Sequence, residues 1–350
     1  MDYKLWFSMV NLSDKVKIEL TQEYKDCKNI FENFETIIKK NKYINNKLTE
    51  YNKFNEMNKI KLRIEYLTRN NINFINYFDE EYPQDLRNIQ NPPYTLFYIG
   101  NIDLLKERKV AIVGARNCTN YGIAVTKQLT KLLNSYNISI ISGGAKGIDS
   151  ETHKTSVELN KSTIVVLGCG VDVIYPKSNY HLFEEIKKSG LIISEFIPGT
   201  PPNAYNFPQR NRIISALSEL VLVIEASEKS GSLITANYAA DQGKDVMVVP
   251  GPINSKNSLG CNKLIRDGAQ ILTCQNDLFT KLKLDALALK RRKTQVAKKI
   301  LAIIGEEPTH FDRLLKNTNV DRMTLIKVLF EMQIENEIVS LPGNYYCKII

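Results

Sequence analysis

Between Lys109 and Val249 the chain repeats one pattern: a short apolar run, a turn, and a helical stretch. The apolar runs are unbroken and rich in Val and Ile, which favour strands. Such runs, separated by helical segments, are typical of a parallel sheet that helices cover on both faces. The pattern therefore predicts an α/β fold: an extended Rossmann-type, doubly wound, mostly parallel sheet. The expected strands are 96–100, 110–113, 138–141, 163–167, 191–193, 220–224 and 246–249.

Helical patterns flank this sheet on both sides. Before it, apolar residues such as Ile30, Phe34 and Ile37 recur at three- and four-residue spacings, which predicts a small helical domain. After it, three helical segments precede a two-strand hairpin with a turn at Pro342-Gly343, a pattern typical of a winged helix. We therefore expect a helical N-terminal domain at 1–75, the Rossmann-type domain at 76–280, a basic linker at 281–295 and a winged-helix domain at 296–350.

The net charge of +9 suggests an anionic partner, but it is unevenly distributed. Residues 281–299 carry 8 basic residues and 1 acidic residue, whereas residues 71–280 carry 20 of each. Any contact with nucleic acid in the central domain must therefore depend on a few well-placed residues, because no basic field covers that domain.

Composition also excludes several classes of protein. The six cysteines lie far apart, without a C-x-x-C pair or a nearby histidine cluster, so we expect reduced thiols, no metal ion and no cofactor. No stretch approaches the roughly 18 to 20 apolar residues of a membrane span. The start of the chain lacks the layout of a secretory signal. We therefore expect a cytoplasmic protein with no membrane contact.

Two glycine-bearing turns follow predicted strands, where ligands of an open α/β sheet bind. The first is Gly114-Ala115-Arg116, before a helix that starts near Tyr121. Glycine lets the backbone approach an anion, the helix N-terminus offers N–H groups, and Arg116 can fork two phosphate oxygens. In the second turn the glycines predict a nest of backbone donors, and a lysine adds a charge. This second turn is Ser142-Gly143-Gly144-Ala145-Lys146-Gly147. Tight helix packing is the alternative reading of either turn.

Two further segments carry residues suited to a single strand. Phe207 is followed by Arg210, Asn211 and Arg212 at the start of a helix. Arginine suits phosphates, asparagine a base edge and phenylalanine base stacking, although a surface helix start is the plainer alternative. Ser230-Gly231-Ser232 opens another helix, where the hydroxyls either cap the helix or reach a ligand oxygen.

The sequence offers no catalytic constellation. Asp149, Asp172, Glu195 and Glu225 lie near strand ends, but none has a histidine or cysteine partner nearby in the sequence. We therefore assign no catalytic residue and expect a binding protein.

The order and spacing of these turns resemble the DNA-processing protein A family (DprA, also called Smf), over roughly residues 82–272. The resemblance implies a dimer that binds single-stranded DNA, protects incoming DNA and helps to load a RecA-type recombinase in natural transformation. A single-strand-binding protein is a further implied partner. Arg116, the Ser142–Gly147 turn and Phe207–Arg212 match the family's DNA-contacting pocket. Ala115 and Lys146 depart from the commoner serine and arginine, and lysine cannot fork a phosphate.

Two other functions remain open at this stage. One is an enzyme that cleaves nucleotides or sugar phosphates on the same fold, like the phosphoribohydrolases, whose Pro-Gly-Gly-x-Gly-Thr-x-x-Glu signature is absent here. The other is a regulator that reads duplex DNA with its winged helix. Residues 300–350 carry 5 basic and 7 acidic residues, a balance that equally fits a protein-binding role.

Overall fold

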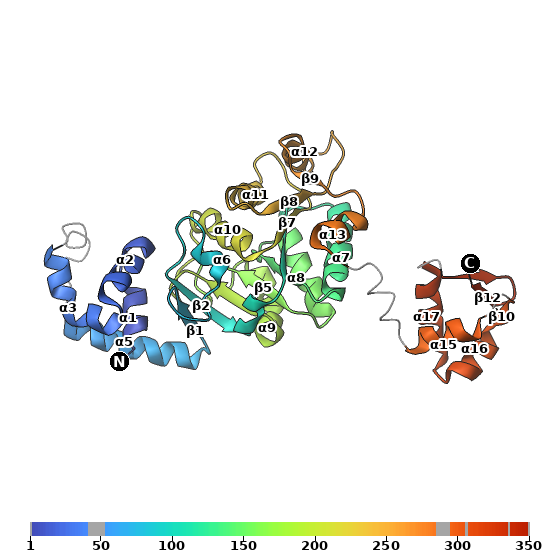
Figure 1. The fold of residues 1–350 in the computed structure, drawn as a ribbon, viewed down its shortest axis with the longest axis horizontal. Helices are drawn as coiled ribbons and strands as arrows, with labels where there is room; N and C mark the ends of the chain where they lie inside the picture. Colours follow the sequence, from blue (N-terminus) through green and yellow to red (C-terminus); the bar gives the residue numbers. More distant parts are fainter. Residues whose placement is uncertain (1, 41–52, 285–294, 305–306, 335–336, 349–350) are drawn as a thin grey trace. The chain divides into compact units, whose positions relative to one another are not determined.

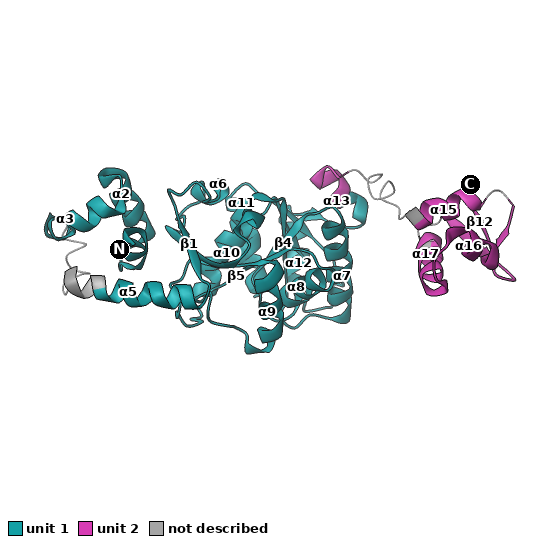
Figure 2. Ribbon diagram, turned by 90° about the horizontal axis from the view of Figure 1, so that it is seen from below, with its two compact units in different colours: residues 1–277 teal, residues 278–350 magenta. Residues whose placement is uncertain are grey.

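The computed structural model describes residues 2–40, 53–284, 295–304, 307–334 and 337–348. The chain divides into two compact units, residues 1–277 and 278–350 (Figure 2). The basic run Lys290-Arg291-Arg292-Lys293 lies outside the described residues. The finer domain boundaries expected from the sequence stay a prediction.

Within the described residues, unit 1 is built around a nine-stranded sheet in the order β1-β2-β6-β5-β4-β3-β7-β8-β9 (Figure 1). From β6 to β9 all neighbouring strands run parallel, and β1 and β2 extend the β6 edge antiparallel. The predicted fold class is confirmed. The strands are β1 (Asn73–Asn76), β2 (Thr95–Gly100), β3 (Lys109–Val113), β4 (Ser139–Ser142), β5 (Thr163–Val166), β6 (Leu191–Ser194), β7 (Leu220–Val223), β8 (Asp245–Val248) and β9 (Gln270–Ile271).

Every residue of the central strands β3 to β7 is buried, because helices cover both faces of the sheet. This burial explains why the strands are unbroken apolar runs. Helices α7 (Asn120–Ser135), α8 (Ile148–Glu158) and α9 (Tyr180–Ser189) pack in succession on one face of the sheet. The other face is covered mainly by α10 (Asn206–Leu217) and α11 (Gly231–Asp241). Shorter helices complete the unit: α6 (Gln84–Arg87), α12 (Leu259–Arg266) and α13 (Gln275–Leu282), which spans the boundary to unit 2.

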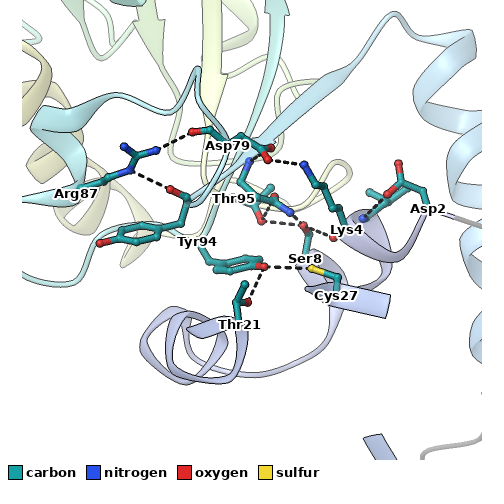
Figure 3. A network of polar contacts seen from close by, with 12 residues as sticks. Asp2, Lys4, Ser8, Thr21, Cys27, Asp79, Arg87, Tyr94 and Thr95 are labelled. Atoms are coloured by element: carbon teal, nitrogen blue, oxygen red, sulfur yellow. Dashed lines mark hydrogen bonds and ion pairs between the residues drawn. The ribbon is translucent and has the colours of Figure 1, made fainter. Parts of the chain in front are cut away.

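The N-terminal helices are α1 (Tyr3–Met9), α2 (Asp14–Tyr24), α3 (Cys27–Lys40) and α5 (Lys53–Arg69). Their own apolar core surrounds the fully buried ring of Trp6. Buried polar contacts join α1 and α2 to the end of the sheet (Figure 3). The Thr95 hydroxyl donates to Ser8 Oγ over 2.9 Å, and the Thr21 and Tyr94 hydroxyls lie 3.0 Å apart. These helices therefore belong to the same compact unit as the sheet.

The sheet has one topological switch point. The chain passes from β3 through β4 and β5 to β6 in one direction, and then β7 returns to the other side of β3. In an open parallel sheet the loops that leave such a pair of strands diverge, and a crevice opens outside their carboxyl ends. The turns after β3 and β7 are therefore the place to look for a ligand site.

Unit 2 is a winged helix, as predicted. Three helices pack around an apolar core that contains Ile300, Leu314 and Leu329. A short strand that the sequence did not predict makes the hairpin three-stranded, in the order β10-β12-β11. The elements are α15 (Gln295–Ile303), β10 (Thr309–His310), α16 (Phe311–Thr318), α17 (Arg322–Ile334), β11 (Ile338–Leu341) and β12 (Tyr345–Lys348).

Candidate functional site

A cavity of about 620 Å³ lies at the switch point, between the turns that follow β3 and β7 and the start of α10. We call it the switch-point cavity. Nine residues that the sequence singled out line it, from three separate segments of the chain. They are Gly114, Ala115, Arg116, Phe207, Arg210, Asn211, Ser230, Gly231 and Ser232. The structure therefore brings three of the four predicted segments together around one space.

The N-terminus of α11 opens into this cavity. The Ser230 side chain caps the helix, with its Oγ accepting from Ser232 N over 3.4 Å, and the first turn holds no acidic residue. Gly231 is exposed, and a side-chain carbon placed on it would meet no atom within 4 Å. The positive end of the helix dipole and the exposed Lys229 and Arg116 therefore make this part of the cavity suited to an anion.

The N-terminus of α7 is not free to bind an anion, although the sequence predicted a phosphate site there. Glu225, at the end of β7, accepts from Thr119 N at 2.8 Å and from Thr119 Oγ1 at 2.5 Å. Thr119 Oγ1 in turn caps the helix at Gly122 N over 3.2 Å. Because a carboxylate of the protein already occupies this helix end, Arg116 is the one charged group that the Gly114–Arg116 turn contributes to the cavity.

The Ser142–Gly147 turn also faces a carboxylate of the protein. Asp149 Oδ2 accepts from Ala145 N over 3.4 Å, and the Gly143 amide also stabilises the charged form of this carboxyl. Burial raises the pKa of Asp149, and the neighbouring Arg210 opposes that rise. Of the five predicted residues in this turn, none lines the cavity and only Lys146 is exposed.

Arg210 is buried beneath this turn. Its Nη1 donates to Gly143 O over 2.8 Å and also to Val166 O. A side-chain carbon at Gly143 would lie 2.6 Å from Arg210 Nη2, so only glycine leaves room for the guanidinium. Burial lowers the pKa of Arg210 to about 10, which keeps it protonated at neutral pH. Arg210 therefore places a positive charge near Asp149 and at the floor of the cavity.

An aromatic pair forms another wall. The rings of Phe207 and Tyr175 lie 5.3 Å apart, and Tyr175 is 40% exposed. Tyr175 was not among the predicted site residues, since it comes late in the long segment after β5. The only sequence signal for it is the Tyr175-Pro176 pair. These two rings give the cavity a surface on which a flat group can stack.

Asn211 and Arg212 make contacts within the protein. The Asn211 amide accepts from Arg210 Nε at 3.2 Å and donates to Gly231 O at 3.3 Å, so it bridges α10 and α11. Arg212 lies outside the cavity. Its guanidinium forms a buried two-pronged ion pair with Glu195, at 2.7 and 2.6 Å, and Nε donates to Asn91 O at 3.0 Å. Arg212 therefore fixes the position of α10.

The described part of the chain contains no cluster of His, Cys, Asp or Glu that could hold a metal ion. The residues that line the switch-point cavity include neither histidine nor cysteine, and Asp149 is their one carboxylate. Among the described residues, no helix is long and apolar enough to cross a membrane.

Comparisons with known proteins agree with this architecture. The model of the DNA recombination-mediator protein A family matches residues 73–283, and the DprA winged helix domain matches residues 285–344. Protein Smf of Synechocystis is 33% identical over 318 residues, which cover 79% of this chain and 80% of that protein. The DNA processing protein DprA of Streptococcus pneumoniae is 45% identical over 202 residues, covering 57% of this chain and 71% of that protein.

Two solved structures are similar as well. The X-ray structure of DNA processing protein A from Streptococcus pneumoniae superposes with a TM-score of 0.65 at 35% identity, covering 79% of this chain and 95% of that one. The structure of DNA processing protein A from Helicobacter pylori, described for its single-stranded DNA binding mode, gives a TM-score of 0.56 at 34% identity. It covers 61% of this chain and 96% of that one. The chain therefore belongs to the DNA recombination-mediator protein A family, a family of DNA-processing proteins that is also called DprA or Smf.

Proposed function

We propose that this chain binds single-stranded DNA at the switch-point cavity and makes or breaks no covalent bond there. The observation that carries the proposal is the pairing of two surfaces in one cavity. The open N-terminus of α11, with Arg116 and Lys229, suits a phosphate, and the rings of Tyr175 and Phe207 suit a base. The Helicobacter pylori relative, described for its single-stranded DNA binding mode, supports this assignment.

A single strand fits this arrangement better than a duplex does. In a duplex the base faces are stacked on one another, whereas an unpaired base can stack on an aromatic side chain. The aromatic wall and the anion-binding helix end line the same cavity of about 620 Å³, so one nucleotide can use both. Because every base has a flat face, we expect little sequence preference.

The predicted site residues take two roles in this proposal. Gly114, Ala115, Arg116, Phe207, Ser230, Gly231 and Ser232 surround the strand. The others hold the cavity in shape: Ser142, Gly143, Gly144 and Gly147 by their turn, and Arg210, Asn211 and Arg212 by contacts within the protein. Lys146 is exposed on a turn whose Gly147 packs against the backbone of Ala115 and Arg116, so it adds charge beside the cavity.

Substitution of Arg116 tests the proposal. We expect Arg116→Ala to weaken binding of a short single-stranded oligonucleotide about tenfold or more, since a charge-assisted hydrogen bond contributes about 1.5 to 3 kcal/mol. Fluorescence anisotropy with a labelled oligonucleotide measures this.

Arg108→Ala is the matched control. Arg108 directly precedes β3, pairs with Glu219 at 2.8 Å, and lies at the opposite end of the strand that leads to Arg116. The control removes the same charge from the other edge of the sheet. Equal affinities for the two variants would contradict the proposed site.

Salt dependence gives a second test. With about three phosphates neutralised per protomer, the logarithm of the binding constant falls with the logarithm of salt concentration with a slope of roughly −2, using about −0.7 per single-strand phosphate. A binding constant that is independent of salt would contradict an electrostatic site.

Binding without catalysis is the favoured interpretation because the candidate carboxylates already have partners. Asp149 faces Arg210, Glu195 is paired with Arg212, and Glu225 accepts from Thr119. Incubation with nucleoside monophosphates tests the alternative of a nucleotide-cleaving enzyme. Steady release of free base would favour that enzyme, and no release above the rate in buffer is the result expected here.

We extend the proposal to the partners that the family resemblance implies. The chain acts in the cytoplasm as a homodimer, protects incoming single-stranded DNA and delivers it to a RecA-type recombinase in natural transformation, in contact with a single-strand-binding protein. Sedimentation tests the dimer. A filament-assembly assay with coated single strands tests delivery, and unchanged assembly upon addition of the protein would contradict it.

The winged helix serves an accessory role in this proposal. Its third helix, α17, exposes the apolar side chains of Met323 and Phe330, which are 74% and 62% exposed, beside the basic Arg322 and Lys327. Residues 300–350 carry more acidic than basic residues, a balance that does not favour binding to a duplex backbone. We expect deletion of residues 290–350 to leave single-strand affinity within about twofold of the full chain, a change of about 0.4 kcal/mol, since no residue that lines the switch-point cavity belongs to this segment. Loss of all DNA binding in that variant would instead favour a duplex reader.

A further inference from the structure

A second cavity, of about 750 Å³, lies on the same edge of the sheet as the switch-point cavity. Its lining comes from the first turn of α7, the end of β7 and the loop between β8 and α12. Tyr121, Glu225, Pro250, Ile253 and Ser258 are among its lining residues. The function proposed above makes no use of this space.

The two cavities share one wall. Residues only two positions apart line different cavities. Asn117 and Ser227 line the switch-point cavity, whereas Thr119 and Glu225 line the second one. Between them, Asn257 Nδ2 donates to Asn117 O over 2.7 Å and closes the wall. Two residues of extended chain span at most about 7 Å, a distance comparable with the step between neighbouring nucleotides of a stretched single strand.

The chemistry of the second cavity differs from that of the first. Its lining contains no lysine or arginine among the described residues, and its one carboxylate, Glu225, is directed at Thr119. Tyr121 and Ile253 expose 51% and 87% of their surfaces at its rim. A phosphate gains no counter-charge in this cavity, whereas the flat face of a base gains apolar contact and stacking.

We propose that the second cavity is a base-binding subsite, in which Tyr121 stacks on the base of a nucleotide next to the one held in the switch-point cavity. This inference rests on the proposed function, since it requires that a single strand occupy the first cavity. The backbone of that strand passes over the wall made by Asn117 and Asn257, and Ile253 covers the base from the loop side.

An abasic scan of the oligonucleotide tests the subsite. One position at a time of a labelled oligothymidine loses its base, and the affinity of each oligonucleotide is measured by anisotropy. The register is determined in a separate experiment, in which a photo-crosslink from the 5′-nucleotide of the same oligonucleotide to the protein is mapped by mass spectrometry. With the wild-type chain, two separate positions are expected to weaken binding, one for each cavity.

The variant Tyr121→Ala should weaken binding of the intact oligonucleotide roughly tenfold, within the range that one stacked base contributes. In this variant, removal of the base that occupies the second cavity should no longer weaken binding, whereas removal of the base that occupies the switch-point cavity should still weaken it. Tyr121→Phe, which keeps the ring, should restore the wild-type scan. Phe78→Ala is the matched control, since Phe78 is 45% exposed and follows β1 at the far edge of the sheet.

The outcomes separate the two proposals. If Arg116→Ala weakens binding while Tyr121→Ala leaves both the affinity and the scan unchanged, the subsite is refuted and the proposed function stands. If the wild-type chain does not bind the oligonucleotide, the proposed function itself fails. Equal losses for Tyr121→Ala and Phe78→Ala would also overturn the subsite, because they would indicate a general surface effect.

Discussion

Two glycine-bearing turns follow parallel strands of the same sheet, and they differ in what their backbone amides face. The backbone of the Ser142–Gly147 turn faces the protein's own carboxylate, Asp149, whose charge the nearby buried Arg210 stabilises. The Ser230–Ser232 turn opens α11 with no acidic residue in its first helical turn, and its glycine is exposed. The amides of the first turn are therefore already occupied by a carboxylate of the protein, and we call it the filled turn. The amides of the second turn are accessible to an anion from solution, and we call it the open turn.

The difference shows that glycine after a strand has two distinct physical uses. At Gly143 the missing side chain makes room for the guanidinium of Arg210. At Gly231 there is open space, so glycine leaves the helix N-terminus accessible to a ligand. We infer that the filled turn supports the cavity and the open turn contacts the phosphate.

The largest expected effect is a difference in the free energy of unfolding between variants of Arg210, which lies beneath the filled turn, and of Arg116, which lies in the cavity beside the open turn. Arg210→Ala leaves Asp149 buried without its counter-charge, and we expect the free energy of unfolding to fall by about 3 to 5 kcal/mol. Arg116 is exposed, so Arg116→Ala should change stability by less than about 0.5 kcal/mol. Chemical denaturation measures both.

The double variant Arg210→Ala/Asp149→Asn is the control for this prediction, since it removes the negative charge of Asp149 as well as the positive charge of Arg210. It should recover part of the lost stability. Equal stability of the Arg116 and Arg210 single variants would break the comparison between a filled and an open turn.

A smaller effect is expected when alanine replaces each glycine. At Gly143 the added carbon would lie 2.6 Å from Arg210 Nη2, and such overpacking costs about 1 to 3 kcal/mol. At Gly231 the added carbon meets nothing, and the change should stay within about 0.5 kcal/mol. Thermal unfolding of the two variants side by side gives the result. A Gly231→Ala variant as unstable as Gly143→Ala would show that the second turn is also packed from inside.

The smallest effect concerns pH and the helix behind the filled turn. His153 of α8 is fully buried, and burial lowers its pKa to about 3. The unfolded chain takes up a proton at this residue below about pH 6.5, which the folded chain resists. Its contribution to stability is therefore complete above that pH and is lost as the pH falls towards 3.

By pH 5.5 the loss due to His153 should be about 1 kcal/mol relative to neutral pH. The difference between wild type and His153→Gln isolates it from other titrating groups. A variant with the same decline in stability between pH 7 and pH 5.5 would show that His153 is not held neutral in the fold.

The sequence was sufficient for the sheet because its strands are buried on both faces. Runs such as Val110–Val113 are continuous and apolar for that reason, and each predicted strand lies within one or two residues of the observed one. The short strands β1 and β9 were missed. The residues of β9 are exposed, and β1 is half exposed, so neither carries the apolar signal of a central strand.

The site was harder to predict because residue type does not reveal direction. Arg210 and Arg212 are two positions apart on α10, yet one lies at the cavity floor and the other is paired with Glu195 outside it. Positions two apart on a helix face different directions, and only the surrounding fold decides which direction meets the ligand. Tyr175 was missed because its one sequence signal, the Tyr175-Pro176 pair, does not indicate a ligand site. Which of these residues touch DNA stays a prediction.

The most direct test of the account is a crystal structure of the chain with a short oligothymidine. The account predicts a phosphate at the N-terminus of α11, within hydrogen-bond distance of the Gly231 or Ser232 amide and of Arg116, with Asp149 still seated in the Ser142–Gly147 turn. A phosphate bound inside that turn with Asp149 displaced, or a strand that avoids the switch-point cavity altogether, would contradict it.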